Sequence, residues 1–176
     1  MTNYTLDQQF LEKCIESGTQ AYREGEYAAG AKIFLRALKQ GKRSDLKDAR
    51  MATVLYNLAH FYFLYGRLRK AELFLERALA HLLEAGGEYH PGIAAVCEKL
   101  ADVAFKQARP DRAELMYARS LAVDKALNRP NDPSVSRKLA KLAQVYASTG
   151  RHDEAFHYTK LALEAKARTR QLESNN

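Results

Sequence analysis

The sequence contains no tryptophan, only four prolines and only nine glycines among its 176 residues. So little glycine and proline excludes a collagen-like chain and a low-complexity disordered one, because both compositions depend on these residues. Long apolar runs are also missing. The most apolar stretch, VLYNLAHFYFLYG, is interrupted by Asn57 and His60 and ends at Gly66, whereas a bilayer crossing needs roughly 20 apolar residues. We therefore predict a helical globular protein without a membrane span.

Cysteine is scarce, and its two copies, Cys14 and Cys97, lie far apart in unlike sequence contexts. Both resemble small core residues, which is typical of a reducing compartment, while a disulfide between them stays open as the alternative. The first residues, MTNYTLDQQFLEKC, have no basic segment followed by an apolar run and predict no export signal. We expect a cytoplasmic protein.

Catalytic signatures are missing as well. The sequence has no glycine-rich phosphate-binding loop, no Gly-x-Ser-x-Gly turn, and no cysteines and histidines at metal-binding spacing. His152 and His157, for example, are five residues apart and would not share a helical face well. We therefore predict that the protein is not an enzyme and that it uses no metal or cofactor.

Positive charge is in excess, with a formal net charge of +7. The excess lies near the carboxyl terminus, where the segment from Arg137 to Arg170 contains eight lysines and arginines but only three acidic residues. Such a surplus attracts an acidic partner, whether a peptide, a nucleic acid or a lipid headgroup.

A repeat organises the whole chain. Four turn sequences align at Gly25, Gly66, Ala108 and Gly150, at spacings of 41, 42 and 42 residues. A small residue follows each turn by five positions, and a second small residue with a leucine comes seven positions later. Two antiparallel helices approach closely only where such small residues lie at the crossing, so each repeat is predicted to be a helical hairpin. The small positions are Gly30, Ala71, Ala113 and Ala155, followed by Ala37, Ala78, Ser120 and Ala162.

Helix-boundary signals divide the chain into eight helices. Pro91, Pro110 and Pro133 fall where helices should begin, and Asp132 is a suitable N-cap. The predicted helices span 6–23, 26–40, 45–65, 67–85, 91–107, 110–127, 133–149 and 152–171. They form four repeats, at 6–40, 45–85, 91–127 and 133–171, in a single array over 1–176.

The motifs GEYHPGIAAVCEKLA, LYNLAHFYFLYGRLRKAELFLERAL and NDPSVSRKLAKLAQVYASTGRHDEA resemble the tetratricopeptide repeat family, in particular the 42-residue repeats of kinesin light chains. The resemblance covers nearly the whole chain. It implies an all-α, right-handed superhelical solenoid of four helix-turn-helix pairs, about eight antiparallel helices, whose first helices line a concave peptide-binding groove. It also implies a non-catalytic protein-interaction adaptor.

Two departures limit what the resemblance implies about the partner. The paired asparagines of the family motif survive only as Asn57, since Glu98 and Lys99 replace them in the third repeat, and an alanine and Lys141 in the fourth. The residues that clamp chaperone tails are missing in the first repeat, where Ile15 and Thr19 stand. Binding of a chaperone tail is therefore disfavoured.

The candidate groove residues lie on the predicted first helices. In the second repeat, aromatic residues spaced along one helical face predict a platform for a partner side chain, or alternatively part of the core. In the third and fourth repeats, lysines and an arginine predict a clamp for an acidic segment, or alternatively a solvated face. The candidates are Tyr22, Arg23, Tyr56, Asn57, His60, Phe63, Leu64, Lys99, Lys106, Arg137 and Lys141.

The leading hypothesis is an adaptor that binds an acidic peptide segment with an apolar anchor. A self-assembly module is the first alternative, which an apolar outer face on 152–171 would favour. That face would comprise Phe156, Leu161, Leu163 and Leu172. A nucleic-acid-binding protein is a weaker alternative, because acidic residues alternate with basic ones through the first three repeats and no recognition motif is present.

Overall fold

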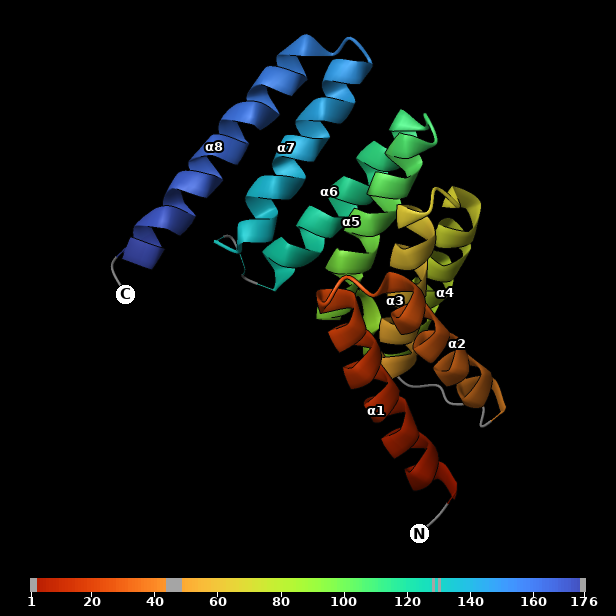
Figure 1. Cartoon of the computed structure of the whole chain (residues 1–176). Helices are drawn as coiled ribbons and strands as arrows, with labels where there is room; N and C mark the ends of the chain where they lie inside the picture. Colours follow the sequence, from red (N-terminus) through yellow and green to blue (C-terminus); the bar gives the residue numbers. More distant parts are fainter. Residues whose placement is uncertain (1–2, 44–48, 128, 130, 175–176) are drawn as a thin grey trace. The chain divides into compact units, whose positions relative to one another are not determined.

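The computed structural model describes residues 3–43, 49–127, 129 and 131–174, and these contain eight α-helices and no strand (Figure 1). Every predicted helix is present, and its ends agree with prediction within three residues. The predicted start of the third helix, residue 45, lies outside the described residues. The helices are α1 (Asn3–Arg23), α2 (Tyr27–Arg43), α3 (Ala49–Leu64), α4 (Leu68–Gly86), α5 (Pro91–Lys106), α6 (Pro110–Ala126), α7 (Pro133–Ser148) and α8 (His152–Ser174), with a 3₁₀ turn at Gly87–Tyr89.

The chain divides into two compact units, Met1–Gly87 and Glu88–Asn176. The N-terminal unit holds the pairs α1–α2 and α3–α4, and the C-terminal unit holds α5–α6 and α7–α8. Each unit thus contains two of the four predicted repeats. The prediction that all four form a single array stays a prediction.

The turns inside the four pairs share one backbone geometry. Their central residues have positive φ values of 81° at Gly25, 69° at Gly66, 56° at Ala108 and 75° at Gly150. The amide of the following residue donates to a carbonyl five positions back, which is the closing bond of a Schellman motif. These bonds measure 2.8 Å from Glu26 to Ala21, 2.8 Å from Arg67 to Tyr62, 3.0 Å from Arg109 to Ala104 and 3.0 Å from Arg151 to Tyr146. The predicted turn positions are confirmed.

Side-chain caps begin two of the first helices, and the cap at Asp132 was predicted. The Asp132 carboxylate accepts a hydrogen bond from the Ser134 amide at 2.8 Å, and His90 Nδ1 accepts one from the Gly92 amide at 3.0 Å. Each cap immediately precedes a proline, whose missing N–H is one that the first helical turn leaves unpaired in any case.

Small residues bring the paired helices close together. In the N-terminal unit, a Cβ on Gly30 would lie 2.3 Å from the Tyr22 ring, and one on Gly18 would lie 2.7 Å from the Phe34 ring. In later pairs, Ala71 and Ala113 are fully buried and Ala155 is half-buried. Each unit therefore packs large rings against positions that have little or no side chain.

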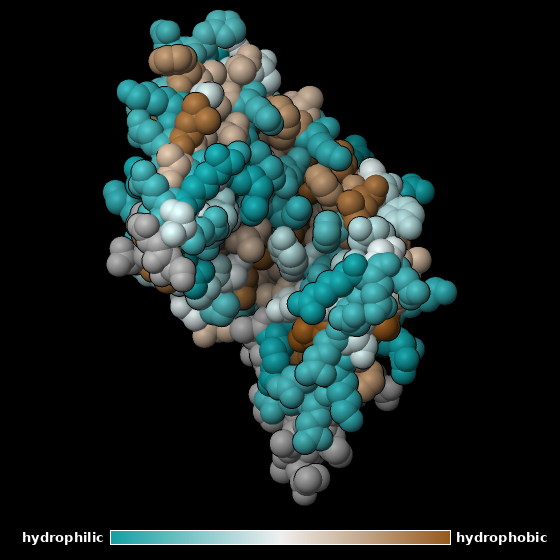
Figure 2. All heavy atoms as spheres, turned by 60° about the vertical axis from the view of Figure 1, so that its left-hand side comes forward, coloured by the Kyte–Doolittle hydropathy of each residue, from teal (hydrophilic) through white to brown (hydrophobic). Residues whose placement is uncertain are grey.

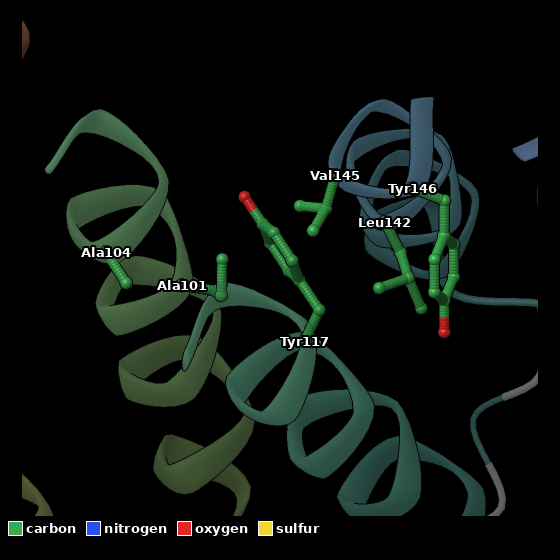
Figure 3. Packing of buried hydrophobic residues seen from close by; sticks show 7 residues of the cluster. Ala101, Ala104, Tyr117, Leu142, Val145 and Tyr146 are labelled. Carbon is green, nitrogen blue, oxygen red and sulfur yellow. The ribbon is translucent and has the colours of Figure 1, made fainter. Parts of the chain in front are cut away.

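The core of the C-terminal unit joins three helices. Tyr117 of α6 lies between Ala101 of α5 and Val145 of α7, with Leu142 beside it (Figure 3). The first helix of the fourth repeat therefore packs on the helix pair of the third repeat.

Hydrophilic side chains cover most of the face in Figure 2, with smaller hydrophobic patches among them.

A buried ion pair lies in the same contact. Lys138 Nζ of α7 donates to Asp124 Oδ2 of α6 at 2.5 Å, and both side chains are at least 95% buried. Removal of either partner would leave the other charge buried without compensation, so the two side chains couple α7 to α6. Both cysteines are buried and unpaired, as the core interpretation predicted.

Candidate functional site

The candidate groove residues lie on α1, α3, α5 and α7, the first helix of each pair. They form one group within each compact unit. We call the group on α1 and α3 the N-terminal surface (Tyr22, Arg23, Tyr56, Asn57, His60, Phe63 and Leu64). The group on α5 and α7 is the C-terminal surface (Glu98, Lys99, Asp102, Lys106, Arg137 and Lys141).

Tyr22 links the two helices of the N-terminal surface. Its hydroxyl donates to the main-chain carbonyl of Asn57 at 2.9 Å, and its ring meets that of His60 edge-on at 6.2 Å between centroids. The Asn57 side chain donates back to the Thr53 carbonyl at 2.9 Å. Burial, followed by the nearby Tyr65, raises the pKa of Tyr22 well above its ordinary value, so the hydroxyl stays a neutral donor.

The predicted aromatic platform on α3 is half-buried. Tyr56, His60 and Phe63 are each partly covered, while Leu64 is 47% exposed and Arg23 is exposed. The structure therefore lies between the two alternatives of buried core and open platform. About half of Leu64 and the uncovered parts of these rings are therefore open to solvent.

Other aromatic side chains at the end of α3 lie outside the predicted candidate residues. Phe61 and Tyr65 pack with centroids 4.5 Å apart, and Tyr62 stacks on Phe74 of α4 at 5.4 Å. Their spacing of three to four residues marks a second face of α3. Tyr65 is 58% exposed and adds to the apolar surface around Leu64.

Charged side chains interlock across the C-terminal surface. Arg137 of α7 donates through Nε and Nη2 to the two carboxylate oxygens of Glu98 on α5, at 2.9 and 3.2 Å. Lys141 Nζ donates to Asp102 Oδ1 at 2.7 Å and to Glu98 Oε1 at 3.4 Å. Lys99 approaches the other oxygen of Asp102 at 3.4 Å. Three cations thus surround two carboxylates.

The electrostatics of this cluster favour its ionised state. Burial by itself would raise the pKa values of Glu98 and Asp102. Burial is the largest single effect, but the hydrogen bond from Arg137 and the nearby cations together outweigh it at Glu98. The hydrogen bonds from Lys141 and Tyr117 and the charges of Lys141 and Lys99 do so at Asp102, so both pKa values are lowered. Tyr117 donates to Asp102 Oδ1 at 2.6 Å, which connects the surface network to the core.

The structure brings together three of the four predicted cations: Lys99, Arg137 and Lys141. Lys106 lies on the exposed last turn of α5. Sequence reasoning treated Glu98 only as a departure from the family motif and missed its pairing. A signal was present, because Glu98 precedes Arg137 and Lys141 by 39 and 43 residues, close to one repeat length. Opposite charges at that offset face each other on neighbouring first helices.

The tetratricopeptide repeat family model matches residues 50–126 and again residues 94–168, which together make up more than half of the chain. The chain belongs to the tetratricopeptide repeat family. No curated protein matches the sequence.

Several solved structures share this tetratricopeptide fold. BtubC (BKLC) from P. vanneervenii has a TM-score of 0.84 and 24% sequence identity, and the match covers 91% of this chain and 64% of that one. A putative kinesin light chain from Podosopora anserina with nearly identical TPR-like repeats has a TM-score of 0.76 and 19% identity, over 90% of this chain and 76% of that one. MamA has a TM-score of 0.70 and 20% identity, over 92% of this chain and 81% of that one.

These likenesses confirm the all-α repeat fold and the resemblance to kinesin light chain repeats. At under 25% identity they show the fold alone, and this tetratricopeptide chain spans 64% of the length of BtubC. The family as a whole mediates protein–protein interaction or assembly and is typically non-catalytic. Within the described residues, no helix has the length and apolar character to cross a membrane, and no three His, Cys, Asp or Glu side chains are grouped to hold a metal ion.

Proposed function

We propose that this tetratricopeptide chain is a non-catalytic, cytoplasmic adaptor that binds a peptide segment of a partner protein on its first helices. The observation that carries the proposal is the fixed geometry of the C-terminal surface. Arg137 donates hydrogen bonds to both carboxylate oxygens of Glu98, yet its side chain remains 56% exposed. A guanidinium oriented in this way is prepared to bind a carboxylate or a main-chain carbonyl without first losing side-chain freedom.

The charge of the partner segment follows from the same cluster. With Lys106 included, the C-terminal surface carries four cations and two carboxylates, a net charge of about +2, so it attracts acidic groups only weakly over distance. We therefore expect a segment with a single well-placed acidic or carbonyl group rather than an acidic run. The interleaved carboxylates also argue against a nucleic acid, whose phosphates would approach Glu98 and Asp102.

The N-terminal surface supplies the apolar anchor of the proposal. Leu64 is 47% exposed beside the half-buried rings of His60 and Phe63. Aromatic surfaces that are partly covered by their own fold lose little entropy when a partner side chain packs on them. We expect an apolar partner residue to bind here.

The test compares matched variants of the full chain in affinity capture from cells that produce it. Leu64→Ser and Arg137→Ala change the proposed surfaces. Leu115→Ser and Arg36→Ala make the same changes at exposed positions of the second helices α6 and α2. A partner that binds wild type and both controls but is lost with Leu64→Ser or Arg137→Ala supports the proposal. Loss only with the two controls would place the binding site on the second helices and overturn it.

Acidic character is measured separately, once the partner segment has been mapped with overlapping peptides. The dissociation constant of the mapped peptide should rise only modestly, by about threefold, between 50 and 300 mM NaCl, because few charges are involved. A rise of a hundredfold or more would indicate an acidic run and contradict the single-group expectation.

Self-assembly is the second candidate function. It is favoured by three of the four predicted apolar side chains of α8, Phe156 at 75%, Leu163 at 64% and Leu172 at 47% exposed, whereas Leu161 is half-buried. Sedimentation velocity over a hundredfold range of concentration tests it, since an assembly module would change its sedimentation coefficient and a monomeric adaptor would not.

A further inference from the structure

An open groove lies between α7 and α8. The groove has a volume of about 340 Å³ and is lined by apolar and small side chains, with two polar exceptions, Gln144 and Thr159. Beside it, Phe156 and Leu163 of α8 are 75% and 64% exposed. The other lining residues are Ala140, Ala143, Ala147, Ala155, Ala162 and Leu163. We call this groove and its rim the end face.

The preceding repeat shows what such a face accommodates. The positions 42 residues earlier on α5 and α6 contact α7 directly. Tyr117, the counterpart of Thr159, packs against Leu142, Val145 and Tyr146 of α7. Tyr117 is 2% exposed, whereas Thr159 is exposed. The same position of the repeat is therefore covered by a neighbouring helix on α5–α6 and open to solvent on α7–α8.

The size of the residue at this register differs between the two faces. In the covered positions it is a large apolar side chain, Phe34 in the first repeat, Leu75 in the second and Tyr117 in the third. Thr159 is far smaller, which is why a groove remains between α7 and α8. A helix that docks on the end face must therefore bring its own bulky apolar side chain to fill the space.

Charge at the end face is inverted relative to the covered face. Asp124 of α6 pairs with Lys138 of α7, but the residue 42 positions after Asp124 is Lys166. The carboxylates Glu98 and Asp102 are likewise replaced by the neutral Ala140 and Gln144. A docking helix should carry an acidic residue where α7 carries Lys138.

From these observations we propose that the end face binds an amphipathic helix of a partner protein. Its recognition pattern is an acidic residue followed by bulky apolar residues four, seven and eight positions later. That is the spacing from Lys138 to Leu142, Val145 and Tyr146, with the charge of the first position reversed. The apolar residues fill the alanine-lined groove, and the acidic residue pairs with Lys166. This surface is separate from the first-helix surfaces of the proposed function.

A second copy stacked head to tail does not satisfy this pattern. Aligning the turns places Lys13, Ser17 and Gln20 of α1 where α7 has Lys138, Leu142 and Val145. Two of these are polar residues facing an apolar groove, and Lys13 would meet Lys166 with like charge. The charges and polarity thus favour a different helix over α1 of another copy.

The probe for the test is a synthetic peptide of residues 133–148 that carries Lys138→Glu and a hydrocarbon staple on its solvent face. The staple removes the cost of ordering a short helix. Fluorescence anisotropy with the full chain should give micromolar binding, and the unmodified Lys138 peptide should bind about tenfold more weakly. Absence of binding by the Glu peptide would overturn the proposal.

Three protein variants locate the binding. Thr159→Tyr reproduces Tyr117, fills the groove and should weaken the Glu peptide at least tenfold while the chain stays folded by circular dichroism. Lys166→Glu should reverse the preference, so that the Lys138 peptide binds more tightly. Arg168→Glu makes the same charge change two residues on, about 200° around α8, and should leave both affinities within twofold.

Two results would contradict this assignment. Equal binding of the Glu peptide to wild type and Thr159→Tyr would show that the groove is not its site. A dimer in sedimentation that Thr159→Tyr abolishes would assign the end face to a second copy instead of a partner helix.

Discussion

Ala108 is the one residue other than glycine with positive φ among the described residues, and replacing it with glycine should stabilise the protein. Its φ of 56° lies in the left-handed region, which costs an L-residue with a Cβ roughly 1–2 kcal/mol. Glycine removes this cost but adds about 0.4–1 kcal/mol of unfolded-chain entropy to be lost on folding. Because Ala108 is exposed, no packing changes. The expected net gain for Ala108→Gly is about 0.8 kcal/mol in the free energy of unfolding.

Gly150 provides the reciprocal experiment in the same unit. It has a φ of 75°, and a Cβ added there would meet no atom within 4 Å. The cost of Gly150→Ala is therefore conformational and should be about 0.8 kcal/mol, with the opposite sign. Ala118→Gly serves as the control, since this exposed residue is helical and the same change should cost about 0.8–1 kcal/mol.

Thermal and urea unfolding measure all three variants. An increase of 1 kcal/mol corresponds to about 2–4 °C in the melting temperature for a chain of this size. We expect Ala108→Gly to melt higher than wild type, and Gly150→Ala and Ala118→Gly to melt lower. If Ala108→Gly lost as much stability as Ala118→Gly, the left-handed turn would not carry the assigned penalty and the reasoning would fail.

Three further predictions concern buried polar groups. Lys138→Met should cost about 3–5 kcal/mol in urea unfolding by leaving Asp124 buried without its partner, and the double change with Asp124→Leu should recover most of that loss; equal stability of the single and double variants would contradict it. The lowered pKa values of Glu98 and Asp102 mean that the unfolded chain binds protons first, so their contribution is complete above their unfolded pKa values of about 4 and is lost as pH falls through the lower folded values. Melting temperatures from pH 6 to pH 2.5 should show this loss, and the double variant Glu98→Gln and Asp102→Asn should show a flatter profile. Burial raises the pKa of the Cys97 thiol, so iodoacetamide at pH 8 should alkylate it at a rate on the order of 100-fold slower in the native protein than in urea; fast native labelling would show that the core around it opens.

The pairing of charged side chains across α5 and α7 was not predicted from the sequence. Lys99, Arg137 and Lys141 were correctly placed on the faces of first helices, because helical periodicity fixes which residues share a face. Their neutralisation by Glu98 and Asp102 was not predicted. Which side chains meet across neighbouring helices depends on crossing geometry and side-chain reach, and a periodic pattern contains neither.

The sequence by itself determined the helices, the four turns and the repeat. These features depend on local chemistry, namely glycine in three of the four left-handed turns, proline and Asp132 at helix starts, and small residues at fixed intervals. Tertiary structure decided which polar groups are buried and which faces stay open. The Asp124–Lys138 pair is buried where α7 packs on the preceding pair, and the end face beside Thr159 is open where no described helix packs on it. The burial of these groups depends on contacts between repeats, which a single repeat does not contain.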